Sequence, residues 1–132
     1  MKSFRGRAGG ERGAVAVEFA LILPVLLMIL MGTIEFGRVY SQFQVYNGAA
    51  REGARCAAVQ ATDFGDCVVQ TEIEQAAQPY DVAQTASVAG ACTDESVGTN
   101  VRVSWLQDFD INIPFWGDVT LDRTIEATFR CE

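Results

Sequence analysis

Two sets of residues in this 132-residue chain have side chains capable of chemistry, an isolated carboxylate and four cysteines. The carboxylate is Glu18, which together with Pro24 is the only interruption of the apolar run over residues 14–34. A carboxylate inside an apolar helix costs about 2–3 kcal/mol, so we expect Glu18 to face a partner charge, a cavity or another subunit. The alternative is that Glu18 lies close enough to the aqueous interface to reach water.

The four cysteines all follow the apolar run, and their even number favours two disulfides in an oxidising compartment. Among the three possible pairings we prefer Cys56 with Cys67, which end one predicted helix and begin the next, and Cys92 with Cys131, which share the apolar phase of two predicted strands. If those strands flank a third, the second pair lies about 10 Å apart and requires a bend at a sheet edge. A four-cysteine metal site is less expected, because paired C-x-x-C spacing is missing from the sequence.

Other chemistry is excluded by composition. The chain has no histidine, which removes His-based zinc sites and the Ser-His-Asp and Cys-His catalytic groups. Residues 108–112 imitate the start of a calcium loop, but Ile113 and Val119 replace its glycine and its final glutamate. Neighbouring carboxylates at residues 63–66 and 94–95 are interpreted as solvated loop charges. We therefore expect no enzyme activity, no catalytic residue, no cofactor and no metal, and the net charge of −7 argues against binding nucleic acid.

The apolar run is long enough to position Glu18 within a membrane. Its 21 residues form a helix of about 31 Å, close to the thickness of one hydrocarbon core. Basic residues crowd the first dozen positions, whereas only Arg38 follows closely, so the N-terminus is expected in the cytoplasm and the rest of the chain outside. Residues 61–132 carry about ten negative charges, consistent with an exported region. The run is longer than the core of a cleaved secretory signal, so we expect it to be retained.

The spacing from Gly13 to Glu18, after a short basic leader, resembles the processing signal of type IV pilins and pseudopilins. In that family a membrane prepilin peptidase cuts after the glycine, and the fifth mature residue is a glutamate. The resemblance implies that Gly13 is the last leader residue, Ala14 is the mature N-terminus and Glu18 is that glutamate. The carboxylate of Glu18 would then meet the terminal amine of a neighbouring subunit, an attraction that strengthens in a medium of low dielectric constant.

Further motifs narrow the resemblance to the TadE-like pseudopilins of tight-adherence pilus systems. Cys56 departs from this family, which often has an aromatic residue there. The resemblance implies four partners: the prepilin peptidase, other pilin subunits, an inner-membrane assembly platform and membrane lipid. The motifs that carry it are Glu18-Phe19-Ala20-Leu21, Leu23-Pro24, Ile34-Glu35-Phe36-Gly37-Arg38 and Ala49-Ala50-Arg51-Glu52-Gly53-Ala54-Arg55.

Beyond the membrane the helix is predicted to continue through residues 35–60, with Glu35 and Arg38 paired one turn apart. Pro24 predicts a kink or local unwinding within the membrane part. A second helix is expected over residues 67–78, with Asp66 as its N-cap and Val69, Ile73 and Ala76 buried. An apolar stripe on the long helix is expected to cover the exported domain, and its residues are Phe36, Val39, Tyr40, Phe43, Tyr46, Ala50, Ala54 and Ala57.

Alternating apolar and polar residues predict strands in the last third of the chain. The strongest spans residues 119–131, its partner contains Val101, Val103 and Trp105, and a weaker strand spans residues 85–92. The strong strand should bury Val119, Leu121, Ile125, Ala127, Phe129 and Cys131. Residues 107–118 are expected to form a connecting loop packed by Phe109, Phe115 and Trp116.

These patterns predict an α+β protein with a long N-terminal transmembrane, pilin-like helix and a small exported domain that contains a short helix and an antiparallel sheet. The predicted segments are a leader (1–13), a membrane span (14–34), an exported helix (35–60) and the α+β domain (61–132). The expected function is that of a structural minor pilin or pseudopilin that supports pilus assembly, adhesion or secretion. The alternative is a monomeric, single-pass, membrane-anchored binding module.

Overall fold

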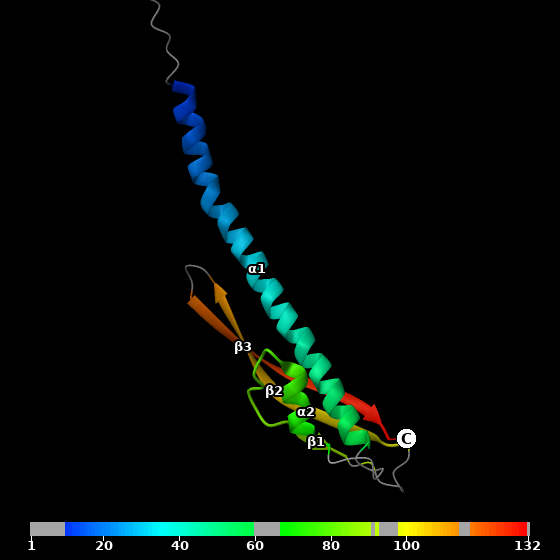
Figure 1. The fold of residues 1–132 in the computed structure, drawn as a ribbon. Coiled ribbons are helices and arrows are strands. Elements are labelled where there is room, and N and C mark those ends of the chain that lie inside the picture. The colour runs from blue at the N-terminus through cyan, green and yellow to red at the C-terminus, as the bar shows by residue number, and fades with distance from the viewer. Residues whose placement is uncertain (1–9, 60–66, 91, 93–97, 114–116, 132) are drawn as a thin grey trace, which may run out of the picture.

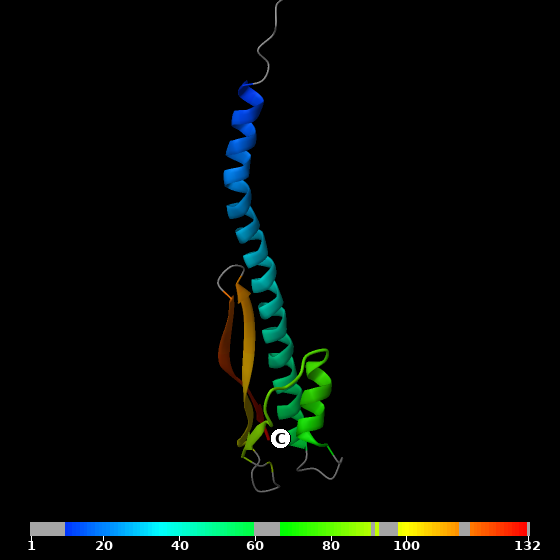
Figure 2. The same cartoon turned by 90° about the vertical axis from the view of Figure 1, so that its left-hand side faces the viewer.

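The fold is seen in a computed structural model, which describes residues 10–59, 67–90, 92, 98–113 and 117–131. Its elements in chain order are α1 (Gly10–Val59), α2 (Val69–Ala77), β1 (Ser87–Ala89), β2 (Asn100–Ile113) and β3 (Gly117–Arg130). Helix α1 runs the length of the molecule, and α2 and the sheet pack against its C-terminal half (Figures 1 and 2). The predicted α+β class, with one long helix and a small antiparallel sheet, is confirmed.

Helix α1 has 50 residues and includes Pro24 without a break, so the local unwinding considered at this proline does not occur. In the described part of the chain, α1 is long and apolar enough to cross a membrane, with a mean hydropathy of 2.6 over its best 18-residue window. None of that window is buried within the molecule. The most apolar part of the helix is therefore exposed and does not contribute to the core of the chain.

The core forms where small residues of α1 let α2 and the sheet approach closely. Gly53 is the tightest point, because a Cβ atom there would lie 2.5 Å from Cγ1 of Ile73 in α2. Tyr46 contacts the ring of Phe109 edge-on at 5.7 Å between centroids. The predicted apolar stripe is buried only from Tyr46 onward, whereas Phe36 and Tyr40 are 71% and 55% exposed, because the core packs against the C-terminal part of α1. The buried side of α1 includes Ala49, Ala50, Ala54 and Ala57.

The three strands form one antiparallel sheet in the order β1-β2-β3. Strands β2 and β3 pair along their whole length, from Asn100 opposite Arg130 to Ile113 opposite Gly117. The loop predicted for residues 107–118 is therefore wrong, since most of it is strand. Phe109 is buried against α1, whereas Phe115 and Trp116 lie outside the described residues.

The burial predicted for the apolar face of β3 is only partly correct. Ile125 and Cys131 are buried, but Val119, Leu121 and Phe129 are 42%, 46% and 41% exposed. The reason is that β3 is an edge strand, and the rings of α1 that cover this end of the sheet, Phe43 and Tyr46, pack against Phe109 of β2. The alternation predicted the strand but not what covers it.

Two shorter elements also differ from their predictions. Helix α2 begins at Val69, with Val68 at the N-cap position and no side-chain cap, whereas Asp66 lies outside the described residues. Its buried residues are Ile73 and Ala77, four apart on the face toward α1, while Ala76 is exposed.

Strand β1 has only three residues, because the chain leaves the sheet at Gly90, whose φ is +88°. A side chain there would be strained, and its Cβ atom would lie 2.8 Å from the carbonyl oxygen of Asn100.

Candidate assembly site

The predicted processing junction, Gly13–Ala14, lies in the N-terminal part of α1 and is exposed. A Cβ atom added to Gly13 would meet nothing within 4 Å. The fold therefore leaves this junction open to another protein, and the molecule's own packing does not require a glycine there. Cleavage at this junction stays a prediction.

Glu18 lies one helical turn beyond Ala14, on the same face of α1. Its side chain is exposed, and the structure shows no hydrogen bond or ion pair to it from any residue in the described ranges. After cleavage, the amine of Ala14 and the carboxylate of Glu18 would form two opposite charges on one face. A second parallel helix shifted by about one turn, roughly 5.4 Å, would bring its Ala14 amine beside the Glu18 carboxylate of the first helix.

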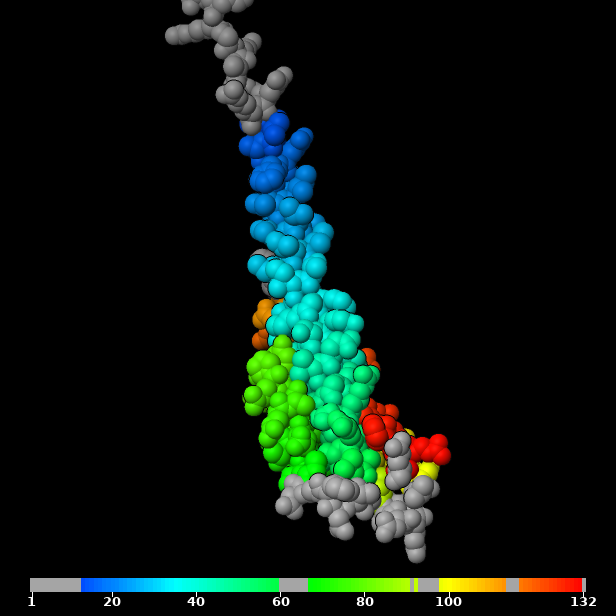
Figure 3. Space-filling view, turned by 45° about the vertical axis from the view of Figure 1, so that its right-hand side comes forward, coloured from blue at the N-terminus to red at the C-terminus, as the bar shows by residue number. Residues whose placement is uncertain are grey.

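The surroundings of Glu18 are apolar. The side chains of this part of α1 project into open space, and the space-filling view shows the narrow N-terminal half of α1 standing clear of the domain (Figure 3). Such a large exposed apolar surface marks contact with lipid or with other proteins. Among the more exposed side chains are Val15, Phe19, Leu21, Ile22, Ile29 and Ile34.

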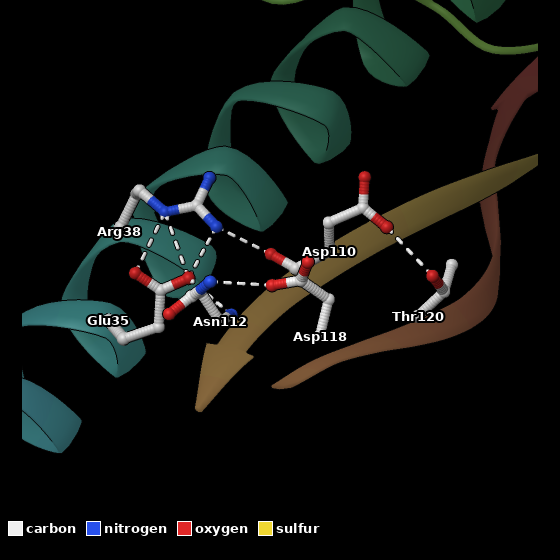
Figure 4. A network of polar contacts seen from close by, with 6 residues as sticks. All are labelled: Glu35, Arg38, Asp110, Asn112, Asp118 and Thr120. Atoms are coloured by element: carbon white, nitrogen blue, oxygen red, sulfur yellow. Dashed lines mark hydrogen bonds and ion pairs between the residues drawn. The ribbon is translucent and has the colours of Figure 1, made fainter. Parts of the chain in front are cut away.

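Where the apolar part of α1 ends, a polar cluster joins the helix to the β2–β3 hairpin (Figure 4). Arg38 donates from Nε to both carboxylate oxygens of Glu35, at 3.2 and 3.1 Å. It also donates to the backbone carbonyl of Asp110, and the backbone N–H of Asn112 donates to Oε1 of Glu35 at 3.0 Å. The predicted Glu35–Arg38 pair is present, and its two contacts with the hairpin backbone were not predicted.

These two backbone contacts satisfy a part of β2 that β1 does not reach. Strand β1 pairs only with residues 102–104 of β2, and the polar backbone groups at Asp110 and Asn112 lie beyond it on the same strand. A carboxylate and a guanidinium supply the acceptor and the donor that a neighbouring strand would supply. Two side chains of α1 thus hold the hairpin through backbone groups of β2.

Hydrogen bonding from Arg38, and then from the N–H of Asn112, lowers the pKa of Glu35 from 4.5 to about 2. The same hydrogen bond with Glu35 raises the pKa of Arg38 above its ordinary value. Glu35 is 17% exposed and Arg38 is 43% exposed, so water screens this pair in part. Both groups stay ionised at neutral pH, and the cluster acts as a constant link between helix and hairpin.

Polar pairs between the two strands stiffen the hairpin near this link. The amide of Asn112 donates to Oδ1 of Asp118 at 2.6 Å, and the hydroxyl of Thr120 donates to Oδ1 of Asp110 at 2.8 Å. Both pairs join residues directly opposite each other in the register. The polar side chains at this end of the hairpin therefore have partners within the chain.

The structure contains two disulfides, Cys56–Cys67 and Cys92–Cys131, which are the two pairs that we preferred from the sequence. Their Cα atoms are 5.9 and 5.4 Å apart. The bend that the second pair requires is made at Gly90, where the chain turns out of β1 toward the end of β3. The first disulfide ties the end of α1 to the segment before α2, and the second ties the end of β3 to the rest of the domain.

A buried polar group in the sheet carried no recognisable signal in the sequence. Gln107 is 4% exposed, and its Oε1 accepts from Nε1 of Trp105 and from the N–H of Ala83, both at 3.1 Å. These contacts hold the segment between α2 and β1 against the sheet. The part of the chain that the structure describes contains no group of three or more Cys, Asp or Glu residues arranged to hold a metal ion.

In a comparison with known protein families, residues 13–55 match the family model described as TadE-like protein. No curated protein and no solved structure matches this chain. The matched segment begins at Gly13 and includes Glu18, Glu35 and Arg38. It confirms the resemblance predicted from the sequence motifs. Through residues 13–55, the chain is therefore identified as similar to the TadE-like proteins.

Proposed function

We propose that this chain is a structural minor pilin or pseudopilin of a tight-adherence pilus, cut between Gly13 and Ala14 by a prepilin peptidase. The uncut protein spans the cytoplasmic membrane once, with its basic N-terminus inside and its disulfide-bonded domain outside. Its partners are the peptidase, an inner-membrane assembly platform, membrane lipid and other pilin subunits. The family match and the long apolar helix α1 support this proposal.

One observation carries the proposal, namely a helix that is apolar over its N-terminal half and holds an exposed carboxylate. Glu18 has no partner among the described residues, although a carboxylate at that position is costly in a membrane. A helix that serves only as a membrane anchor gains nothing from this carboxylate. A subunit that packs beside others gains an ion pair, because the amine that cleavage creates at Ala14 supplies the opposite charge in a neighbouring helix.

The proposal is tested by the variant Glu18→Leu. Membrane insertion should become easier, and cleavage should continue because the Gly13–Ala14 junction is unchanged. An unpaired amine in the helix bundle should cost about 3 kcal/mol, which lowers incorporation into pili about a hundredfold. The expected result is processed protein that accumulates in the membrane fraction and is missing from sheared pili.

A relocated carboxylate provides the matched control. The double variant Glu18→Leu with Leu21→Glu restores one acidic residue to the apolar run, three residues further along the helix. If position matters, this variant should stay out of pili as the single variant does. Normal incorporation of Glu18→Leu would contradict the assembly role and favour a membrane-anchored binding module, which would also retain an uncut leader by mass spectrometry.

A further inference from the structure

The feature on which this inference rests is an apolar groove between α1 and the end of the β2–β3 hairpin. Met28, Gly32 and Phe36 line it from the helix, and Ile111, Ile113 and Leu121 line it from the strands. Its volume is about 450 Å³. Its two main polar residues, Glu35 and Asn112, hydrogen-bond to each other, so the groove has little to offer a polar ligand.

The position of the groove along α1 shows what surrounds it. Figures 1 and 2 show the hairpin lying beside α1 and pointing toward its N-terminal half. Met28 and Gly32 belong to the apolar run that we propose to span the membrane. With a rise of about 1.5 Å per residue, they lie about 9 and 3 Å inside the end of that run at residue 34.

The groove would leave the membrane only if the membrane span ended earlier along α1, and the length of the apolar run does not allow this. If the span ended at Met28, only 15 residues would remain after Gly13, or about 22 Å of helix for a hydrocarbon core of about 30 Å. An extension toward the N-terminus would draw Arg12 into the core, at a cost of about 2.5–3.5 kcal/mol. The end of the hairpin therefore lies at the depth of the membrane interface.

We propose that the end of the β2–β3 hairpin is a second membrane contact, and that acyl chains of the outer leaflet fill the groove between Ile113 and α1. This inference rests on the membrane span in the proposed function. The exposed apolar residues Ile113 and Val119 enter the interface, while Asn112 and Asp118 satisfy each other there. Deep entry is opposed, since strand backbone groups without partners are costly in hydrocarbon.

The test places a tryptophan at three positions of the full chain in phosphatidylcholine vesicles. The variants are Ile113→Trp at the hairpin end, Leu21→Trp in the span and Val88→Trp on β1, each with Trp116→Phe. The buried Trp105 is then the same background in all three. Lipids brominated near the headgroup or deep in the acyl chain quench emission according to the depth of the tryptophan.

We expect shallow bromine to quench the Ile113→Trp variant, deep bromine to quench Leu21→Trp, and neither to quench Val88→Trp. Quenching of Leu21→Trp without quenching of Ile113→Trp would overturn the hairpin contact and leave the membrane span intact. Loss of quenching at both positions would overturn the span as well. A blue-shifted emission of Ile113→Trp that neither brominated lipid quenches, and that depends on the protein-to-lipid ratio, would assign the groove to a second copy of the chain instead.

Discussion

The contact between Gly53 of α1 and Ile73 of α2 predicts how the substitution Gly53→Ala changes the free energy of unfolding. Alanine at a helical glycine normally stabilises by about 1 kcal/mol, because glycine is the poorer helix former. At Gly53 the new Cβ atom would lie 2.5 Å from Cγ1 and 2.8 Å from Cδ1 of Ile73, whose side chain is fully buried. Overpacking of this kind costs about 1–3 kcal/mol.

Gly53→Ala should therefore lower the free energy of unfolding by about 0–2 kcal/mol in the wild-type background. The variant Ile73→Ala removes both clashing atoms and alone costs about 2–5 kcal/mol. In that background, Gly53→Ala should raise the free energy of unfolding by about 1 kcal/mol. The coupling between the two substitutions is then about 1–3 kcal/mol.

Urea unfolding of the full chain in detergent micelles, followed by tryptophan fluorescence with the disulfides intact, measures these differences. Gly48→Ala is the matched control, since it lies in the same helix and its new Cβ atom would meet nothing within 4 Å. It should stabilise the protein by about 1 kcal/mol in both backgrounds. Equal stabilisation by Gly53→Ala and Gly48→Ala in the wild-type background would refute the close approach of the two helices.

Three other predictions concern the site. Gly13→Val should leave a full-length precursor by mass spectrometry, because the valine side chain blocks close approach of the peptidase to the backbone. The chain's own fold has room for a side chain at this position, so the variant should still fold. Normal cleavage of this variant would remove the main support for processing. Protein recovered from the cell exterior should show no free thiol in non-reducing peptide mapping, and four alkylatable thiols would exclude both disulfides. The lowered pKa of Glu35 predicts a contribution to stability that is present above pH 4.5 and is lost as the pH falls toward 2. Urea unfolding at several pH values should show a smaller loss over this interval for Glu35→Gln than for wild type, and identical profiles would contradict the link.

The sequence predicted the elements whose pattern is local. The apolar run predicted α1, and the alternation around Ile125 predicted the central part of β3. The hairpin extension was missed because Asp108, Asp110 and Asn112 resembled loop residues, although Phe109, Ile111 and Ile113 continue the alternation of β2. A mixture of polar and aromatic residues next to Pro114 is typical of loops, and only pairing with β3 identifies it as a strand.

Contacts with backbone atoms were beyond prediction for a different reason. The Glu35–Arg38 pair follows from their spacing on one helix, but the hairpin groups that they bind belong to the main chain. Every residue carries such groups, so nothing in the sequence distinguishes Asp110 and Asn112 as their partners. The burial of Val119 and Leu121 was likewise overestimated, because alternation is the same on an edge strand and on a central one.

Glu35 and Arg38 occupy the end of β2 that β1 does not cover, so strand addition at that end of the sheet is blocked. Strand addition from another chain needs a row of free backbone donors and acceptors, and α1 has already taken those of Asp110 and Asn112. The opposite side is the outer edge of β3, with 14 residues and charges at Asp118, Asp122, Arg123, Glu126 and Arg130. Charged side chains along an edge discourage indiscriminate pairing. If the chain is a pilus subunit as proposed, copies crowded in one membrane would join sheets through β3 only in a register that matches these charges.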